Sequence, residues 1–524
     1  MSILRYKLRH IAGAGGYRKV CALALCCSMA TFAGEQSTGQ IRFKVKPLTQ
    51  EEESLRLATK IWQPATPLTR GGLPSYLDNS RSPHFPEVFN QGSNNSCSQA
   101  AGVRYAYSFE VNRLLGREAS KKENVFCYHF TWNFLNEGEN QGAHAFLGYE
   151  LMKECGTVNL EHWDDAPYSF PEQTRWLSGA QSYIEAMQFR VKDYAKINLK
   201  TREGIDLFKR FLYDHGDGSP VGGVATISYQ TDDWGYKRYD GPGESRIGYI
   251  VTKEGKDGPH AITVTGYDDS VEYDFDGDGK IDDDEKGAFI FINSWGEDWG
   301  SEGRCLLPYS VVLADPSDGG LKETDAEAFM VQPEISSPSL VFVATLQYNR
   351  RNELSFFLGA ADGEDAKSPQ FETQASIMRL QGGANPMQGW NASEEMEVAF
   401  NFSGFRDKIS GFENPSFFLS VRRTAASGTG ILKSFKVVDF VTGAVYTSDV
   451  NNLPLSGGIT VMTTGRQKLS AYTSCSPWLW MEPGTKRPKM SPFVVRTASG
   501  KLRKLKINGY EAKTGTLTIK HAGL

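Results

Sequence analysis

The stretch QGSNNSCSQAAGVRYAYSFEVNRLLG, residues 91–116, places a cysteine directly before a predicted helix. Apolar side chains recur there at the spacing of one helical face: Ala100, Val103, Tyr107, Val111 and Leu114. Gly116 follows as a stop signal. Because the positive end of a helix favours an anion, Cys97 in the first turn is a candidate thiolate nucleophile, with an ordinary buried thiol as the alternative.

The segments after this helix predict an α+β unit of two lobes, residues 73–330. Helices are predicted within residues 139–156 and 201–218, and apolar strands within 220–229, 260–269 and 287–296. Helices that come first and strands that come later favour an α+β arrangement.

The last part of the chain predicts an all-β domain. A Pro/Ser-containing linker, residues 331–340, leads into short strands within 341–524, with hairpin turns at Thr442-Gly443 and Ser499-Gly500. Many short strands at this spacing predict a β-sandwich. We interpret the tryptophans of this domain as core residues, with a sugar-stacking surface as the alternative: Trp390, Trp478 and Trp480. A structural, targeting or adhesive role is expected, with a surface, glycan or protein as ligand.

The N-terminal residues predict export. Basic residues precede the apolar run VCALALCCSMATFA, which is too short to span a bilayer, so residues 1–33 are typical of a secretory signal. A membrane anchor is the alternative. Residues 34–72 are polar and predict an extension or short pro-segment, with one helix that Thr49 caps. The mature protein is expected to be secreted or extracytoplasmic.

Composition and cysteine count narrow the class further. The chain has 524 residues and a net charge of -5, which does not point to a nucleic-acid partner. Five of its eight cysteines follow the signal: Cys97, Cys127, Cys155, Cys305 and Cys475. An odd number in a secreted protein leaves at least one free thiol. Two disulfide pairings are considered, Cys127 with Cys155 and Cys305 with Cys475.

Three further side chains could complete a nucleophilic site around Cys97. His260 opens an apolar strand and can serve as its base, while Asn293 ends another strand and can fix the imidazole tautomer. Gln91 can donate an amide N–H to a developing oxyanion, beside the backbone N–H of Cys97.

These segments together resemble the papain-like cysteine peptidases of family C1. FPEVFNQGSNNSCSQAAGVRY is similar to the segment around their catalytic cysteine, GPHAITVTGYDD to their histidine strand, and FIFINSWGEDWGSEGRCLL to their asparagine segment. The resemblance implies a helical lobe that carries Cys97 and a β-barrel-like lobe that carries His260 and Asn293. It also implies that Trp295 packs over the His–Asn pair, and that Gln141 and Gly142 lie along the substrate backbone.

The chain also departs from the family pattern. Ser98 stands where the family has an aromatic residue, Asn94 where it has a disulfide cysteine, and Pro259 precedes the histidine. Residues 34–72 are too few for the family's long pro-domain helices. None of these differences removes a catalytic group.

An acidic loop between the histidine and asparagine strands predicts a metal site. DFDGDGKIDDDE, residues 274–285, fits the EF-hand loop pattern, for which calcium is the expected ion. The predicted ligands are Asp274, Asp276, Asp278, the Lys280 carbonyl, Asp282 and Glu285. Strand-like flanks predict a calcium loop without EF-hand helices, and an acidic hairpin tip without a metal is the alternative.

The sequence therefore predicts a secreted cysteine peptidase that acts on proteins or peptides through a thioacyl-enzyme. The chemistry itself needs no cofactor, and calcium is expected to be structural. An exopeptidase or transpeptidase of the same chemistry, and a non-catalytic binding protein on the same scaffold, are the alternatives. A monomer is the default expectation.

Overall fold

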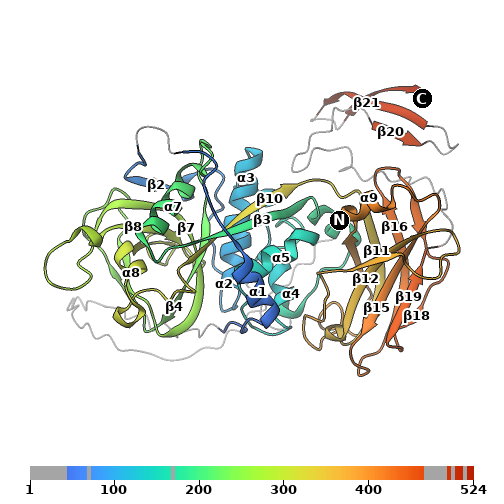
Figure 1. Cartoon of the computed structure of the whole chain (residues 1–524), viewed down its shortest axis with the longest axis horizontal. Coiled ribbons are helices and arrows are strands. Elements are labelled where there is room, and N and C mark those ends of the chain that lie inside the picture. The colour runs from blue at the N-terminus through green and yellow to red at the C-terminus, as the bar shows by residue number, and fades with distance from the viewer. Residues whose placement is uncertain are drawn as a thin grey trace, which may run out of the picture. The chain divides into compact units, whose positions relative to one another are not determined.

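A computed structural model gives the fold of the chain (Figure 1). It describes residues 44–67, 72–166 and 172–464, and the backbone of three strands near the C-terminus. The predicted signal lies outside these residues. None of the described helices combines enough length and apolar character for a membrane crossing.

One continuous helical run forms the centre of the helical lobe. It consists of α2 (Cys97–Gln99), the π-helix η2 (Ala100–Tyr107) and α3 (Ser108–Leu115), and it ends at Gly116 with a φ of 61°. The predicted helix is thus present, but Leu114 is 53% exposed. Because a π-helix has a wider turn than an α-helix, residues beyond η2 do not keep the face that a 3.6-residue spacing predicts.

The other predicted helices also form, with the caps that their sequences provide. Thr49 makes a reciprocal capping box with Glu52 at the start of α1, Thr201 caps α7, and α5 ends at Gly156. The α-helices are α1 (Gln50–Ala58), α4 (Tyr128–Leu135), α5 (Ala145–Cys155), α6 (Ala180–Ala186), α7 (Arg202–Asp214), α8 (Tyr309–Leu313) and α9 (Arg406–Ile409). Short 3-10 turns are η1 (Asn79–Arg81), η3 (Lys122–Asn124), η4 (Glu172–Thr174), η5 (Asp283–Glu285), η6 (Pro316–Asp318), η7 (Arg351–Glu353) and η8 (Ser403–Phe405).

A 10-stranded sheet forms the β lobe. Its order is β1-β3-β10-β4-β7-β8-β9-β6-β5, with β2 paired to β7. The strands are β1 (Lys60–Ile61), β2 (Tyr76–Asp78), β3 (Phe189–Asn198), β4 (Ala225–Asp232), β5 (Gly235–Arg238), β6 (Tyr249–Lys253), β7 (Asp257–Glu272), β8 (Lys286–Ile292), β9 (Arg304–Pro308) and β10 (Glu327–Ile335). The buried side chains of its central strands pack against α7 and α8. The two-lobed α+β prediction is confirmed.

The predicted linker is wrong over its first half. Residues 331–335 belong to β10 and pair with β3, from Val331 opposite Tyr194 to Ile335 opposite Phe189. The register shifts between Gln332 and Pro333, so the proline is accommodated at an irregularity of the ladder. A proline therefore did not mark the end of the strand here.

The C-terminal region is a sandwich of two antiparallel sheets. One has the order β14-β11-β16-β17, with β18 paired to β16, and the other has the order β13-β12-β15-β19. Phe342 of the first sheet meets Phe417 of the second at 5.7 Å between ring centroids, so the two inner faces share one core. The strands are β11 (Leu340–Tyr348), β12 (Leu354–Asp362), β13 (Phe371–Gln374), β14 (Met396–Asn401), β15 (Pro415–Arg423), β16 (Gly430–Asp439), β17 (Val445–Thr447), β18 (Leu453–Pro454) and β19 (Ile459–Thr463).

Details of this domain confirm one prediction and correct another. Gly443 has a φ of 74° and closes the turn between β16 and β17, as predicted. Trp390 is 43% exposed and is not a core residue, because it lies in a long loop between β13 and β14. Trp478, Trp480 and the predicted Ser499-Gly500 turn lie outside the described residues. A separate three-stranded sheet follows, made of β20 (Phe493–Arg496), β21 (Leu502–Glu511) and β22 (Thr516–Gly523).

The cysteine pairing considered for the helical lobe is wrong. Cys127 and Cys155 are both buried free thiols, as are Cys97 and Cys305, and Cys475 lies beyond the described residues. The Cys155 sulfur lies 3.2 Å from Leu151 O on its own helix, whereas the Cys127 sulfur lies 3.9 Å from Asp164 O. The two sulfurs therefore point to different partners.

A buried arginine joins the sandwich to the helical lobe. Arg351 is 1% exposed; its Nε donates to Gly382 O at 2.8 Å and its Nη1 to Met387 O at 3.2 Å. Its guanidinium carbon lies 4.0 Å from the ring centroid of Trp176, which belongs to the helical lobe. The hydrophobic core is likewise continuous, since Phe130 and Tyr183 share a cluster with the sandwich strands.

Replacing Arg351 should destabilise the helical lobe and the sandwich together. We expect Arg351→Ala to lower the free energy of unfolding in urea by about 2–4 kcal/mol, because it removes packing on Trp176 and leaves buried carbonyls without donors. Arg350→Ala is the matched control. It removes the contact of a 42% exposed arginine with the buried Glu353, which keeps Tyr348 Oη and Gly428 N as donors, and should cost less than about 1 kcal/mol. Equal losses for the two variants would contradict a special role for Arg351.

Candidate active site

The predicted nucleophile lies where the two lobes meet. Cys97 begins α2, is 2% exposed, and packs against Ala101 of its own helix and Ala261 of β7. The backbone N–H of Ala261 also donates to the Cys97 sulfur. Ala261 directly follows His260, so Cys97 packs beside the strand that carries the histidine, although 163 positions separate Cys97 and His260 in the sequence.

The predicted histidine and asparagine are hydrogen-bonded to each other. Strands β7 and β8 pair antiparallel with Thr263 opposite Ile292, so the ends of the two strands lie side by side. His260 Nε2 lies 2.8 Å from Asn293 Oδ1, and both residues are buried. An amide oxygen only accepts hydrogen bonds, so Nε2 carries the proton in this contact, and in a neutral ring Nδ1 is then the acceptor.

Aromatic rings enclose the imidazole. The ring of Trp295 lies 4.5 Å from that of His260 with an interplanar angle of 32°, as expected from the resemblance. Tyr229 of β4 meets the imidazole edge-on at 5.7 Å. These rings exclude water from the His–Asn hydrogen bond.

Burial sets the protonation of the cysteine and the histidine. Desolvation raises the pKa of the Cys97 thiol to about 11, although the Ala261 N–H lowers it in part. Desolvation also lowers the pKa of His260 to about 4, and the hydrogen bond that His260 donates to Asn293 offsets this only in part. In the intact chain, the thiol and the imidazole are therefore both neutral at pH 7.

Gln91, the predicted oxyanion donor, is held in place by hydrogen bonds. It is fully buried; its Nε2 donates to Asn94 O at 2.6 Å and its backbone N–H to Ser294 O at 2.9 Å. The Ser294 hydroxyl donates to Gln91 Oε1, which fixes the orientation of the amide. Because an amide nitrogen has two N–H groups, the second one remains for a substrate oxygen.

Polar contacts hold the loop before Cys97 in the place where the family has a disulfide. Asn94 Oδ1 accepts from Gln173 Nε2 at 2.6 Å, with both side chains buried. Asn95 N and Nδ2 donate to the side-chain and backbone oxygens of Asn140 at 2.7 and 2.6 Å. The Ser98 hydroxyl, at the family's aromatic position, donates to Ala143 O. Sequence reasoning missed Gln173, Asn140 and Ser294, because nothing in their local sequence indicates these distant partners.

The N-terminal extension lies along one of the predicted substrate-binding residues. Gly142 N donates to Lys44 O at 2.6 Å, Lys46 N donates to Gly142 O at 3.2 Å, and Val45 forms a parallel bridge with Gly142. The backbone groups of Gly142 are thus already paired. Gln141 contributes its carbonyl to Trp132 Nε1 at 2.9 Å, while its side chain is directed to Glu139.

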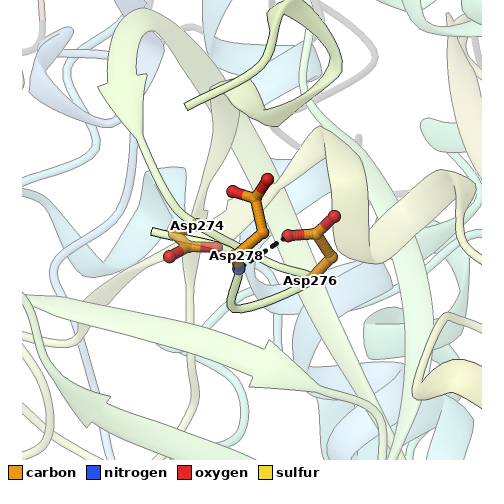
Figure 2. Close-up of side chains that lie close together, drawn as sticks. All are labelled: Asp274, Asp276 and Asp278. Carbon is orange, nitrogen blue, oxygen red and sulfur yellow. Dashed lines mark hydrogen bonds between the residues drawn. The ribbon is translucent and has the colours of Figure 1, made fainter. Parts of the chain in front are cut away.

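The acidic loop brings three of its predicted ligands together. The carboxylates of Asp274, Asp276 and Asp278 have oxygens within 4.8 Å of one another (Figure 2). Asp274 accepts from the N–H groups of Gly277 and Gly279, which shapes the tight turn. The flanks are β7 and β8, so the prediction of a loop without EF-hand helices is confirmed.

The other three predicted ligands lie around this group in different roles. Glu285 is buried and accepts from Phe275 N at 2.5 Å, Asp276 N at 3.2 Å and Asp282 N at 3.1 Å. Desolvation and neighbouring carboxylates raise the pKa of Asp282. Lys280 extends its side chain to Asp278 at 3.5 Å, consistent with only its carbonyl facing a metal. This all-oxygen set suits a hard cation.

A cysteine at a helix start packs beside the strand of a histidine, which is hydrogen-bonded to an asparagine at the end of the paired strand, as the resemblance to papain-like peptidases implies. The chain is 25% identical over 266 residues to an uncharacterized peptidase C1-like protein of Acanthamoeba polyphaga mimivirus, a match that covers 49% of this chain and 72% of that protein. The resemblance to family C1 that the sequence indicates is confirmed. No protein-family model matches the chain.

Solved cysteine peptidases are also similar to this chain. Xylellain, a cysteine protease from Xylella fastidiosa, matches at 18% identity and a TM-score of 0.38, over 56% of this chain and 96% of its own. Procathepsin B from Trypanosoma congolense matches at 14% identity and a TM-score of 0.36, over 56% of this chain and 87% of its own. Because these TM-scores are low, the fold assignment rests on the topology described above.

The shifted pKa of Cys97 can be tested directly by alkylation. In the intact chain, the rate of iodoacetamide labelling of Cys97 should be low at pH 7 and rise about tenfold per pH unit, towards a plateau near the pKa of about 11. The labelling rate rises with pH because the unreactive neutral thiol is the stable form below that pKa. Peptide mapping by mass spectrometry separates Cys97 from the other buried thiols, and a Cys97→Ala variant is the control. Fast labelling of the intact chain at pH 6 would contradict this assignment.

Proposed function

We propose that this chain is a secreted or extracytoplasmic cysteine peptidase that hydrolyses peptide bonds in proteins or peptides. The observation that carries the proposal is the 2.8 Å contact between His260 and Asn293, directly beside the point where Cys97 packs on Ala261. The family resemblance and the relative described above support a peptidase fold. The catalytic activity of this chain is our proposal.

The proposed reaction has two stages. His260 Nδ1 takes the Cys97 proton as the sulfur attacks the peptide carbonyl, and the imidazolium then gives that proton to the leaving amine. A thioacyl-enzyme remains. Water attacks it with His260 as base, which releases the acid and restores the thiol. Gln91 and the Cys97 N–H would bind the oxyanion in both stages, and Asn293 would keep the ring in its reactive orientation.

Substitutions of Cys97, His260 and Gln91 test the reaction. With peptide substrates and the processed chain, Cys97→Ala and His260→Ala should abolish hydrolysis. Gln91→Ala should lower kcat by about 10²–10³-fold, the usual cost of one oxyanion donor. Cys305→Ser, which alters another buried thiol, should retain activity. Measurable hydrolysis by Cys97→Ala would overturn the proposal, and mass analysis of the products distinguishes endopeptidase, exopeptidase and transpeptidase outcomes.

We also propose that the extension before residue 72 is a short pro-segment. Its residues 44–46 occupy both backbone groups of Gly142, which a substrate backbone would need. The neutral thiol and imidazole described above are consistent with a closed, inactive chain. Removal of this segment would admit solvent and substrate, favour the charged forms, and allow a reactive thiolate at mildly acidic pH.

For the acidic loop, we propose a structural calcium ion. Asp274, Asp276, Asp278, the Lys280 carbonyl, Asp282 and Glu285 would hold it, and the carboxylate cluster without a cation would repel itself. The loop joins β7 and β8, which carry His260 and Asn293, so the ion would rigidify the hairpin that positions them. Its charge plays no part in the proposed chemistry.

Chelation and substitution test this calcium site. A chelator should lower the Tm by several degrees, and Asp276→Asn should lower both the calcium affinity and the calcium-dependent gain in Tm. Asp284→Asn is the matched control, because Asp284 is not among the predicted ligands and the contact with Arg202 uses its backbone carbonyl. An unchanged Tm on chelation in the wild-type chain would overturn the site.

A further inference from the structure

A cavity lies where the pro-segment, the helical lobe and the sandwich meet. It has a volume of about 150 Å³, and its apolar floor is formed by Phe134, Leu135 and Leu147. Four charged residues line it: Lys46 and Glu52 of the pro-segment, Glu137 of the helical lobe and Arg379 of the sandwich. Ala143, directly after the predicted substrate-binding Gly142, also lines it, so the cavity adjoins this predicted substrate-binding segment.

The pro-segment already places a basic side chain at this cavity. Val45 pairs with Gly142, and the next side chain, Lys46, reaches Glu137 with a 2.6 Å contact between Nζ and Oε1. The two side chains are 38% and 32% exposed, so solvent screens the pair only in part. A peptide that replaced this segment along Gly142 would meet the same carboxylate.

Glu137 is held in a backbone conformation that is unfavourable for it. Its φ is 57°, the left-handed region that a residue with a long side chain seldom adopts, and Gly138 follows with a φ of 70°. Such strain costs about 1–3 kcal/mol and persists only where surrounding contacts enforce it. The backbone of Glu137 is therefore held by its surroundings, and its carboxylate reaches Lys46 at the cavity.

The sandwich domain supplies those contacts. A Cβ on Gly383 would lie 2.2 Å from Glu137 O, and a Cβ on Gly138 would lie 2.6 Å from Gly382 O, so the two loops pack backbone to backbone. Arg351 holds the sandwich loop through Gly382 O. Arg379 of the same loop pairs with Glu51 of the pro-segment at 3.3 Å.

We propose that Glu137 and the sandwich loop of residues 380–383 form a substrate pocket that takes a basic side chain, lysine or arginine, at one fixed position of the peptide, with the half-exposed Arg379 directed to the solvent side. This proposal rests on the proposed peptidase function and names its substrate preference. The pocket is filled by Lys46 in the intact chain and becomes available when the pro-segment leaves. The C-terminal domain is then part of the substrate-binding surface.

A charge-swap cycle in the full-length chain tests the pocket without requiring catalysis. Lys46→Glu and Glu137→Lys should each loosen the pro-segment and raise the rate of Cys97 alkylation about fivefold, the effect of a part-exposed ion pair worth about 1 kcal/mol. The double variant should return to the wild-type rate. Lys60→Glu is the matched control, because its partner Asp193 lies in β3 and not at the cavity. Failure of the double variant to restore the rate would overturn the pocket.

Matched substrates then test the preference itself. Peptides that differ only by lysine or norleucine at each position should show a higher kcat/KM for lysine at a single position. Glu137→Gln should remove this ratio, and Glu139→Gln in the same loop should retain it. Cleavage without a lysine preference overturns the pocket but leaves the peptidase function standing. Absence of any cleavage, with the charge-swap cycle intact, overturns the peptidase function and with it the substrate role.

Two glycine variants test whether the sandwich loop contributes to the pocket. Gly383→Ala should displace the backbone of Glu137 and lower the lysine preference, because its Cβ has no room. Gly411→Ala lies in the same domain with no atom within 4 Å of its Cβ and should have no effect. Melting temperatures of both variants separate a local effect from unfolding. A full lysine preference in folded Gly383→Ala would show that the sandwich loop is not part of the pocket.

Discussion

The buried hydrogen bond between His260 and Asn293 is the constraint on which the rest of the site depends. An imidazole without water must have its polar atoms satisfied by protein, and it must hold one tautomer to act on a neighbouring thiol. The pairing of β7 with β8 brings the two residues together, and Trp295 covers them. The long helical run then needs only to direct its first residue, Cys97, towards this pair.

The segments around the nucleophile are held by amides and hydroxyls instead of a covalent link. Asn94, Asn95 and Ser98 each bond to a different part of the cleft wall, and Gln173 connects that wall to the segment that packs on the sandwich. A buried polar network is strongest when every member is satisfied, but Asn94 Nδ2 and Asn95 Oδ1 have no hydrogen-bond partner among the described residues. The helical lobe shares its hydrophobic core with the sandwich, which gives the C-terminal domain a structural reason to be present.

Much of the fold and the centre of the site could be predicted from local patterns. The helix that begins at Cys97, the strands of His260 and Asn293, and the cap at Thr49 follow from periodicity and capping chemistry, which act over a few residues. Leu114 was assigned to the wrong face because a π-helix changes the phase of the helix, which no residue in the sequence marks. Pro333 was taken for a linker because a proline at a ladder irregularity is indistinguishable in sequence from one in a loop.

The sequence by itself determined which chemical groups are available: one cysteine at a helix start, one histidine and one asparagine at strand ends, and an acidic loop between them. These assignments depend on residue type and short-range spacing. Only the tertiary structure decided that residues 44–46 lie along Gly142, that Glu137 faces the sandwich loop, and that Cys127 and Cys155 stay apart. Such contacts join residues far apart in the chain, and their energies come from desolvation and packing that no local pattern records.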